Sequence, residues 1–164
     1  MRLFGVTGRS GSGKTTLLIR LLPWLRARGL TISTVKQAHE GFDVDKPGKD
    51  SYEHRQAGAR EVMIASARRW ALMHEYRDQP ELTMDQLLAR MTPVDLVLVE
   101  GFRRWDHPRI EVWRAQVAKP PCFPEDPLVT AVASDGAVPD CPLPVMALDD
   151  IAAIGRLIVE RSGL

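Results

Sequence analysis

The chain has 164 residues, a length that favours a single domain with a sizeable buried core. It contains 45% hydrophobic residues and carries a formal net charge of +1, which argues against a strongly basic nucleic-acid binder. No stretch approaches the roughly 20 apolar residues of a membrane span, and a strand pattern begins at once. We therefore expect a cytoplasmic protein without a signal peptide, forming one domain over residues 1–164.

The first recognisable motif is a complete phosphate-binding loop, Gly-Arg-Ser-Gly-Ser-Gly-Lys-Thr, at residues 8–15. An apolar strand pattern precedes it, and a helical pattern follows at residues 15–28, which Pro23 should loosen and Gly29 should end. In this order, backbone N–H groups wrap the phosphates and the helix N-terminus adds the positive end of its dipole. We therefore predict a nucleotide-binding protein. The predicted contacts are Gly8, Ser10, Gly11, Ser12, Gly13, Lys14, Thr15 and Thr16, with Lys14 on the outer phosphates and Thr15 also on Mg²⁺.

A second strand pattern covers residues 30–35, and a long polar loop follows at residues 37–50. The two strands should be parallel partners or near neighbours in an α/β sheet. Many P-loop proteins place the groups that respond to the γ-phosphate in this loop. Asp50 and His39 are therefore the candidate catalytic residues, an aspartate to orient water and a histidine to touch phosphate oxygens. The alternative is that the polar side chains of this loop are ordinary turn or solvated residues.

Sequence patterns between residues 51 and 91 predict three local structures. Ser51 is expected to be the N-cap of a short helix, and residues 61–66 and 69–74 are expected to pair as a β-hairpin. A further helix is expected over residues 83–91, with Thr83 as its N-cap.

The most apolar run, Leu96–Val99, predicts a central parallel strand that is buried on both faces. Glu100 follows it at the carboxyl end, where P-loop proteins place the acidic residue that faces the metal ion. We predict that Glu100 and Thr15 associate with Mg²⁺. Asp95, at the opposite end of the run, is then too far away to serve.

Three more short strands are expected at residues 110–113, 128–133 and 144–148, before a terminal helix capped by Asp149 or Asp150. Asp135 follows the second of them, at the sheet edge where ligands gather in open α/β folds. A carboxylate there would accept hydrogen bonds from N1–H and N2–H₂ of guanine and so select GTP, because adenine has no matching pair of donors. The standard Asn-Lys-x-Asp guanine motif is absent, and Asp135 before Gly136 is equally consistent with a β-turn.

Together these segments resemble the molybdopterin-guanine dinucleotide biosynthesis adapter family, MobB. The most specific segment is Asp-x-Pro-Gly-Lys-Asp-Ser at residues 45–51. The other segments that carry the resemblance are residues 8–17, 57–59, 69–73, 95–102 and 131–135. The resemblance implies an α/β fold with a mostly parallel sheet flanked by helices, a P-loop NTPase of the SIMIBI type with a β-hairpin insertion.

The resemblance also implies a function. It points to a GTP-binding homodimer that assists the guanylyltransferase joining GMP to molybdopterin, an adapter with at most weak GTPase activity. Lys46, Lys49 and Arg55 would then be placed to meet the phosphate of a bound molybdopterin. The chain departs from the family at residues 36–40, Lys-Gln-Ala-His-Glu in place of Lys-His-x-His-His, which weakens any role for a histidine cluster in metal delivery.

An alternative function remains open from the sequence. A small P-loop kinase, or an ATP-dependent ligase of the dethiobiotin-synthetase type, would share the phosphate loop and the strand that ends in Glu100. Binding of adenine rather than guanine nucleotides would favour that alternative.

Overall fold

A computed structural model describes residues 1–38 and 41–164, which form two compact units. The first comprises residues 1–37 and 92–164, and the second comprises residues 38–91. The first unit is built on a six-stranded sheet with the order β2-β5-β1-β6-β7-β8. Its strands are β1 (Arg2–Thr7), β2 (Ile32–Lys36), β5 (Leu96–Glu100), β6 (Arg109–Val112), β7 (Val129–Ser134) and β8 (Val145–Ala147).

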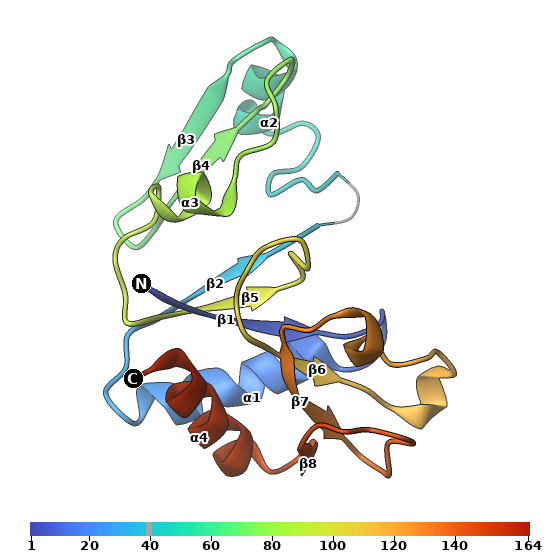
Figure 1. Cartoon of the computed structure of the whole chain (residues 1–164). Coiled ribbons are helices and arrows are strands. Elements are labelled where there is room, and N and C mark those ends of the chain that lie inside the picture. The colour runs from blue at the N-terminus through green and yellow to red at the C-terminus, as the bar shows by residue number, and fades with distance from the viewer. Residues whose placement is uncertain (39–40) are drawn as a thin grey trace. The chain divides into compact units, whose positions relative to one another are not determined.

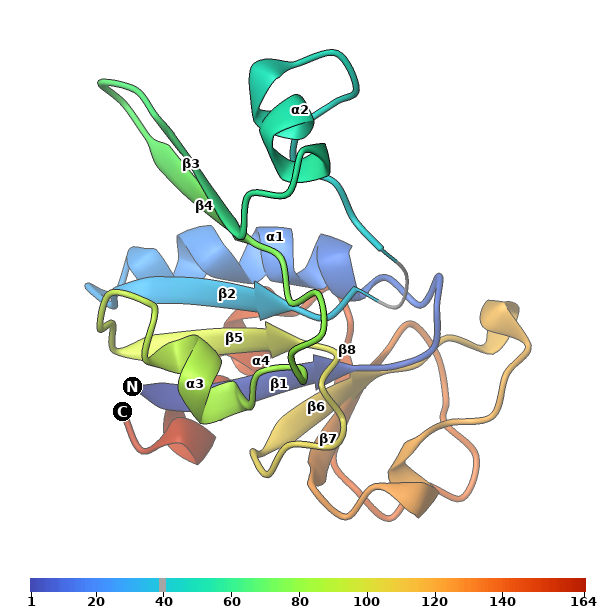
Figure 2. The ribbon, with the colours of Figure 1, turned by 90° about the horizontal axis from the view of Figure 1, so that it is seen from above.

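Every neighbouring pair in this sheet is parallel. Figure 2 shows β2, β5 and β1 running side by side, with β5 between the other two. The strands before and after the phosphate loop are thus near neighbours and not direct partners. Because all strands are parallel, the residues that follow β1, β5, β6 and β7 meet at one edge of the sheet. The predicted fold class, a mostly parallel sheet flanked by helices, is confirmed.

One face of this sheet is covered by two helices, α1 (Lys14–Arg26) and α4 (Ile151–Ser162), as Figure 1 shows. The buried face of α1 follows the helical repeat of the sequence, and Leu21 and Leu25 are fully buried in the core with Leu98 of β5. Pro23 lies inside α1, which ends at Arg26, before the predicted stop at Gly29. The helix α4 begins at the N-cap Asp150, whose carboxylate accepts from the backbone N–H of Ala153 at 2.9 Å.

The opposite face is covered in part by two loops, at residues 101–108 and 118–127, that are tied down by buried charges on β6. The guanidinium of Arg109 donates to backbone carbonyl oxygens of the first loop, those of Arg103, Trp105 and His107. The carboxylate of Glu111 accepts from the backbone N–H groups of Cys122 at 2.7 Å and Phe123 at 2.8 Å in the second loop. Both β6 side chains are fully buried.

The second unit contains α2 (Asp50–Gln56), an antiparallel hairpin of β3 (Glu61–Ala65) and β4 (Trp70–His74), and α3 (Met84–Leu88). The predicted hairpin is confirmed. Thr83 and Gln86 form a capping box at the start of α3, which confirms the predicted N-cap, although the helix ends at Leu88.

The predicted N-cap at Ser51 is wrong. Lys49 occupies the N-cap position with an extended backbone, and α2 begins at Asp50. Ser51 instead contributes, after Arg55, to holding the pKa of Asp45 below its usual value. Asp50 and Glu53 lie in the first turn, where negative charge favours the helix.

Arg55 organises the polar loop of this second unit. Its guanidinium contacts Asp43 at 2.7 Å, Asp45 at 2.6 Å and Glu75 at 2.9 Å, and its side chain is only 9% exposed. The hydrogen bond from Arg55 is the main reason why the pKa of Asp45 lies below its usual value. Arg55 is therefore committed to three carboxylates, and the expectation that it meets a pterin phosphate does not fit this arrangement.

Within the described residues, no helix is long and apolar enough to span a membrane.

Candidate functional site

The phosphate loop has the backbone that its glycines predict. Gly8, Gly11 and Gly13 all have positive φ, at 136°, 81° and 100°. At Gly8 a side chain is excluded as well, because a Cβ would lie 2.3 Å from the carbonyl oxygen of Val112. The loop therefore passes close to the end of β6 before it enters α1. Ser12 Oγ is buried there and lacks a hydrogen-bond partner among the described residues, and Ser10 is exposed on the loop.

Lys14 lies across its own loop. Its Nζ atom donates to the carbonyl oxygens of Gly8 at 2.9 Å and Arg9 at 3.1 Å. Burial lowers the pKa of the Lys14 amine, and the nearby Glu100 carboxylate partly offsets that shift. A phosphate anion would give this partly desolvated ammonium group a stronger partner than either carbonyl.

Thr15 and Glu100 come together, although 85 positions separate them in the chain. The Thr15 hydroxyl donates to Glu100 Oε1 at 3.2 Å, and Lys36 Nζ lies 3.7 Å from the same carboxylate oxygen. The sheet explains this proximity, because Glu100 is paired in register with Val6 of β1 and with Lys36 of β2. A hydroxyl and a carboxylate are oxygen donors of the kind that Mg²⁺ prefers, so the residues present fit the predicted ion. The carboxylate of Asp95, at the other end of β5, instead accepts hydrogen bonds from the backbone N–H and the hydroxyl of Thr31.

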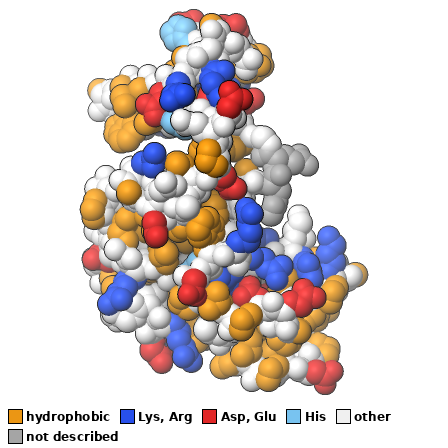
Figure 3. Space-filling model, turned by 45° about the horizontal axis from the view of Figure 1, so that its top comes forward, with side chains coloured by type: hydrophobic (Ala, Val, Ile, Leu, Met, Phe, Trp, Pro, Cys, Tyr) orange, Lys and Arg blue, Asp and Glu red, His pale blue; other side chains and the backbone are white. Residues whose placement is uncertain are grey.

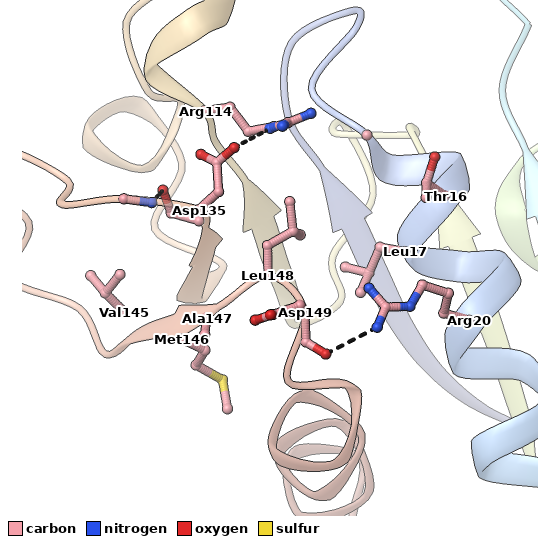
Figure 4. A pocket seen from close by; sticks show the side chains of 13 residues that line it. Thr16, Leu17, Arg20, Arg114, Asp135, Val145, Met146, Ala147, Leu148 and Asp149 are labelled. Atoms are coloured by element: carbon pink, nitrogen blue, oxygen red, sulfur yellow. Dashed lines mark hydrogen bonds and ion pairs between the residues drawn. The ribbon is translucent and has the colours of Figure 1, made fainter.

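A pocket of about 630 Å³ opens beside the start of α1. Figure 4 shows Thr16, Leu17 and Arg20 of α1 on one side of it and the segments after β7 and β8 on the other. The second side includes Asp135, Met146 and Leu148. The pocket thus continues from Gly13 of the phosphate loop to the carboxylate that was predicted to read guanine.

Asp135 is paired with an arginine that the sequence analysis did not single out. Its Oδ2 atom accepts from Arg114 Nε at 2.6 Å, and Arg114 also lines the pocket. Arg20, another residue missed from the sequence, donates to the backbone carbonyl of Asp149 at 3.1 Å. The available signal for Arg114 was its place two residues after the end of β6, the strand next to β7, because neighbouring parallel strands end at the same edge.

The geometry of this unit does not test the roles of the two candidate catalytic residues. Asp50 is an exposed residue at the start of α2, in the second unit. His39 lies outside the described residues. Both roles stay predictions.

The parallel sheet, the glycine-rich loop before α1 and the carboxylate at the end of β5 define a P-loop NTPase fold. Within that class, the family model described as molybdopterin guanine dinucleotide synthesis protein B, MobB, matches residues 3–135. The chain therefore belongs to the MobB family, which takes part in the synthesis of molybdopterin guanine dinucleotide. The resemblance stated from the sequence is confirmed.

Individual relatives agree with this assignment. The chain is 43% identical over 154 residues to the molybdopterin-guanine dinucleotide biosynthesis adapter protein of Escherichia coli K12, covering 92% of this chain and 87% of that protein. It is 44% identical over 136 residues to the protein of the same name from Haemophilus influenzae, covering 81% and 74%. A crystal structure of molybdopterin-guanine biosynthesis protein B matches with a TM-score of 0.73 at 26% identity, over 96% of this chain and 98% of the other.

The kinase alternative has weaker support. A uridine kinase of Leuconostoc citreum is 28% identical over 118 residues, covering 66% of this chain and 56% of the kinase. Its lower identity and shorter coverage favour the adapter over the kinase as the functional class.

Proposed function

We propose that the chain is a GTP-binding adapter that assists the guanylyltransferase joining GMP to molybdopterin, with at most slow GTP hydrolysis. Residues 1–164 act in this proposal as a single nucleotide-binding domain in the cytoplasm. Family membership supports the pathway. The observation that carries nucleotide binding is the pocket that links the phosphate loop to Asp135.

The proposed nucleotide is GTP because of the donors that its base offers. Guanine presents N1–H and N2–H₂ side by side, and a carboxylate accepts from both. Adenine has an acceptor at N1, which a carboxylate oxygen would repel. Asp135 is the acidic pocket-lining residue beside Ser134 and Gly136, next to the phosphate loop, and it is the proposed base reader.

The phosphates and Mg²⁺ are assigned to the opposite end of the site. Gly8, Ser10, Gly11, Ser12, Gly13, Lys14, Thr15 and Thr16 are the proposed nucleotide contacts of the loop and helix start. Thr15 and Glu100 are the proposed residues on the Mg²⁺ side, supported by the 3.2 Å contact between their oxygen atoms. Mg²⁺, when bound, neutralises part of the phosphate charge. Asp50 remains the candidate for orienting an attacking water, and His39 remains the candidate for contacting the phosphate oxygens.

An Asp135→Asn variant tests base reading directly. Xanthine keeps N1–H but carries an oxygen at C2, so an asparagine amide can accept from the first and donate to the second. We expect the variant to lose GTP affinity by at least about tenfold and to gain binding of xanthosine triphosphate, measured by calorimetry. Lys14→Ala is the control, because losing a phosphate contact should weaken both nucleotides alike. If GTP and ATP bind the wild-type chain equally well and Asp135→Asn changes neither, Asp135 does not read the base.

The adapter role is tested by reconstitution. Purified guanylyltransferase, molybdopterin and GTP-Mg²⁺ are assayed for the dinucleotide product with and without the chain. We expect the wild-type chain to increase product formation and Lys14→Ala to fail to do so. The chain alone should form no dinucleotide. Product formation by the chain without the transferase, or rapid phosphorylation of a small molecule, would contradict an adapter.

The homodimer is also part of the proposal, and the hairpin supplies a surface for it. Met63, Trp70 and Leu72 lie on one face of β3–β4 and are 63%, 64% and 43% exposed. Figure 3 shows hydrophobic side chains gathered over this hairpin. An apolar patch of this kind on a two-stranded hairpin favours burial against another chain.

Sedimentation equilibrium tests the dimer. We expect the wild-type chain to be a dimer and the double variant Met63→Glu/Trp70→Glu to be a monomer. Ile19→Glu is the matched control, because Ile19 is as exposed as Trp70, at 64%, but belongs to α1 and not to the hairpin. A monomeric wild-type chain, or a dimer that only Ile19→Glu disrupts, would contradict the proposal.

A further inference from the structure

The turn directly after Glu100 has a backbone that needs support. Gly101 and Phe102 have φ values of 89° and 51°, so two successive residues take the left-handed conformation where β5 ends. A residue with a side chain rarely takes this conformation, because its Cβ approaches the following carbonyl oxygen. Contacts from elsewhere in the chain must therefore hold Phe102 in place.

Gln37 makes two such contacts, one through its backbone and one through its side chain. Its backbone N–H donates to the carbonyl oxygen of Glu100 at 2.9 Å, and its Oε1 atom accepts from the backbone N–H of Phe102 at 2.8 Å. The side chain also covers Gly101, where an added Cβ would lie 2.9 Å from the Cβ of Gln37. Gln37 therefore binds the chain on both sides of the turn.

The order of the strands brings Gln37 to this turn. Strands β2 and β5 are parallel neighbours, and Lys36 is paired in register with Glu100. Figure 2 shows the two strands side by side, ending at the same edge of the sheet. Gln37 is the first residue after β2, and it belongs to the same compact unit as Glu100.

The turn matters for the site because it follows a residue proposed to lie at the Mg²⁺ ion. The Glu100 side chain is only 12% exposed, and its Oε1 atom lies 3.2 Å from the Thr15 hydroxyl. Mg²⁺ demands a near-ideal octahedral arrangement at short distances, so it tolerates little displacement of a ligand. Residues that hold a metal ligand in place without contacting the metal commonly change the affinity for the metal. The bonds from Gln37 fix the backbone that carries Glu100.

We propose that Gln37 is a positioning residue for Mg²⁺-dependent nucleotide binding: it holds the turn after Glu100 and so sets the place of the Glu100 carboxylate beside Thr15. The inference rests on the proposed role of Glu100 at the Mg²⁺ ion. Gln37 acts through Glu100 and contacts neither the ion nor the nucleotide. It thereby has a role at one of the positions, within residues 36–40, where the chain departs from the MobB pattern.

The experiment is a calorimetric titration of GTP into the wild-type chain and its variants, once with excess Mg²⁺ and once with EDTA. The ratio of the two affinities is the Mg²⁺ effect, and a variant that is merely less well folded loses affinity in both conditions alike. Gln37→Met keeps the length of the side chain but removes the accepting oxygen. We expect its Mg²⁺ effect to fall about two- to tenfold, the range of one lost hydrogen bond, with the affinity in EDTA unchanged. Gln37→Glu retains an acceptor and should retain at least the wild-type effect.

Gln86→Met is the matched control. Gln86 Oε1 accepts from the backbone N–H of Thr83 at 2.9 Å, a comparable bond in the second unit, so its loss should leave the Mg²⁺ effect at the wild-type value. Glu100→Gln tests whether Gln37 acts through Glu100. This variant should lose most of the Mg²⁺ effect, and adding Gln37→Met to it should lower the effect no further.

Three outcomes overturn the inference. An unchanged Mg²⁺ effect in Gln37→Met, or equal losses with Mg²⁺ and with EDTA, rejects Gln37 as a positioning residue. Equal impairment of Gln37→Glu and Gln37→Met shows that the acceptor is not what matters. A further loss in the Glu100→Gln background shows that Gln37 acts on the ion or the nucleotide directly. A failure of the proposed metal site is recognised separately, because Glu100→Gln then keeps the full Mg²⁺ effect.

Discussion

The two faces of the six-stranded sheet are built from different chemistry. On the helical face, Phe4, Leu98 and Ile110 of the strands are fully buried against α1 and α4, and the contacts are apolar. On the loop face, the fully buried residues include Arg109 and Glu111, which hold backbone groups of the loops at residues 101–108 and 118–127. Alternating side chains of the single strand β6 serve the two faces.

The apolar face mainly determines the stability of the sheet, whereas the face with buried charges also determines where the loops around the site lie. Apolar packing on the helical face stabilises the sheet, and at α1 it also places Leu17 beside the pocket. On the loop face, Arg109 fixes the loop that follows Glu100. Glu111 fixes the loop at residues 118–127, in which the carbonyl oxygen of Pro120 accepts from Arg9 of the phosphate loop. Variants of strand residues on the first face that do not line the pocket, such as Leu98, should therefore change folding alone, and variants on the second face should change folding and nucleotide binding together.

The largest effect is expected from Arg109→Met. The guanidinium contacts Asp126 at 3.3 Å and backbone carbonyls of the first loop, so its loss removes the nearer cation from a buried carboxylate and the donor from several buried carbonyl oxygens. We expect a loss of about 4 kcal/mol in the free energy of unfolding, measured with urea.

Arg103→Met is the control for this variant. Arg103 lies 3.6 Å from the same carboxylate but its side chain is 40% exposed, so its loss should cost less than about 1 kcal/mol. Equal losses for the two variants would show that burial of Arg109 is not what matters.

A smaller loss is expected on the helical face. Leu98→Ala removes a fully buried side chain from the central strand and should cost about 3 kcal/mol, again by urea unfolding. Because the side chain faces the helices, the affinity for GTP at a temperature where the variant is folded should remain that of the wild-type chain. A parallel loss of affinity would break the proposed division between the faces.

Acid should destabilise the loop face through His107. Burial, reinforced by the positive charge of Arg109, lowers the pKa of His107 to about 4, whereas the unfolded chain has the ordinary value near 6.5. The unfolded state binds more protons between these values, so stability is full above about pH 6.5 and falls as the pH drops toward 4. We expect a loss of about 2 kcal/mol between pH 7 and pH 5.

The matched variant is His107→Leu, which has no titrating group. Its unfolding free energy should depend less steeply on pH in the same window, whatever its stability at pH 7. Identical pH slopes for the two chains would exclude a contribution from His107.

The smallest effect is expected from Glu111→Gln. An amide accepts through one oxygen and has no negative charge, so one of the two backbone N–H groups of the 118–127 loop loses its partner, at a cost of about 1.5 kcal/mol.

Burial, with the charge of Glu111, also raises the pKa of the adjacent Cys122 thiol. We expect faster labelling of Cys122 by a thiol reagent in the variant, with the half-buried Cys141 as an internal reference; faster labelling of both would indicate global loosening instead.

The helical face was largely predictable from the sequence, and the loop face was not. The leucine repeat of α1, the apolar run of β5 and the capping box at Thr83 are local patterns that reveal burial and termini directly. The buried charges Arg109 and Glu111 depend on loops that return from elsewhere in the chain, which no local pattern encodes. The same is true of Arg114 at Asp135, because its partner is brought close only by the order of β6 and β7.

The central claim is that the pocket beside the phosphate loop is a guanine nucleotide site. Calorimetric titration of GTP-Mg²⁺ and ATP-Mg²⁺ into the purified wild-type chain tests it most directly. Two hydrogen bonds to a carboxylate predict that GTP binds at least about tenfold more tightly than ATP. Equal affinities, or tighter binding of ATP, would contradict the account.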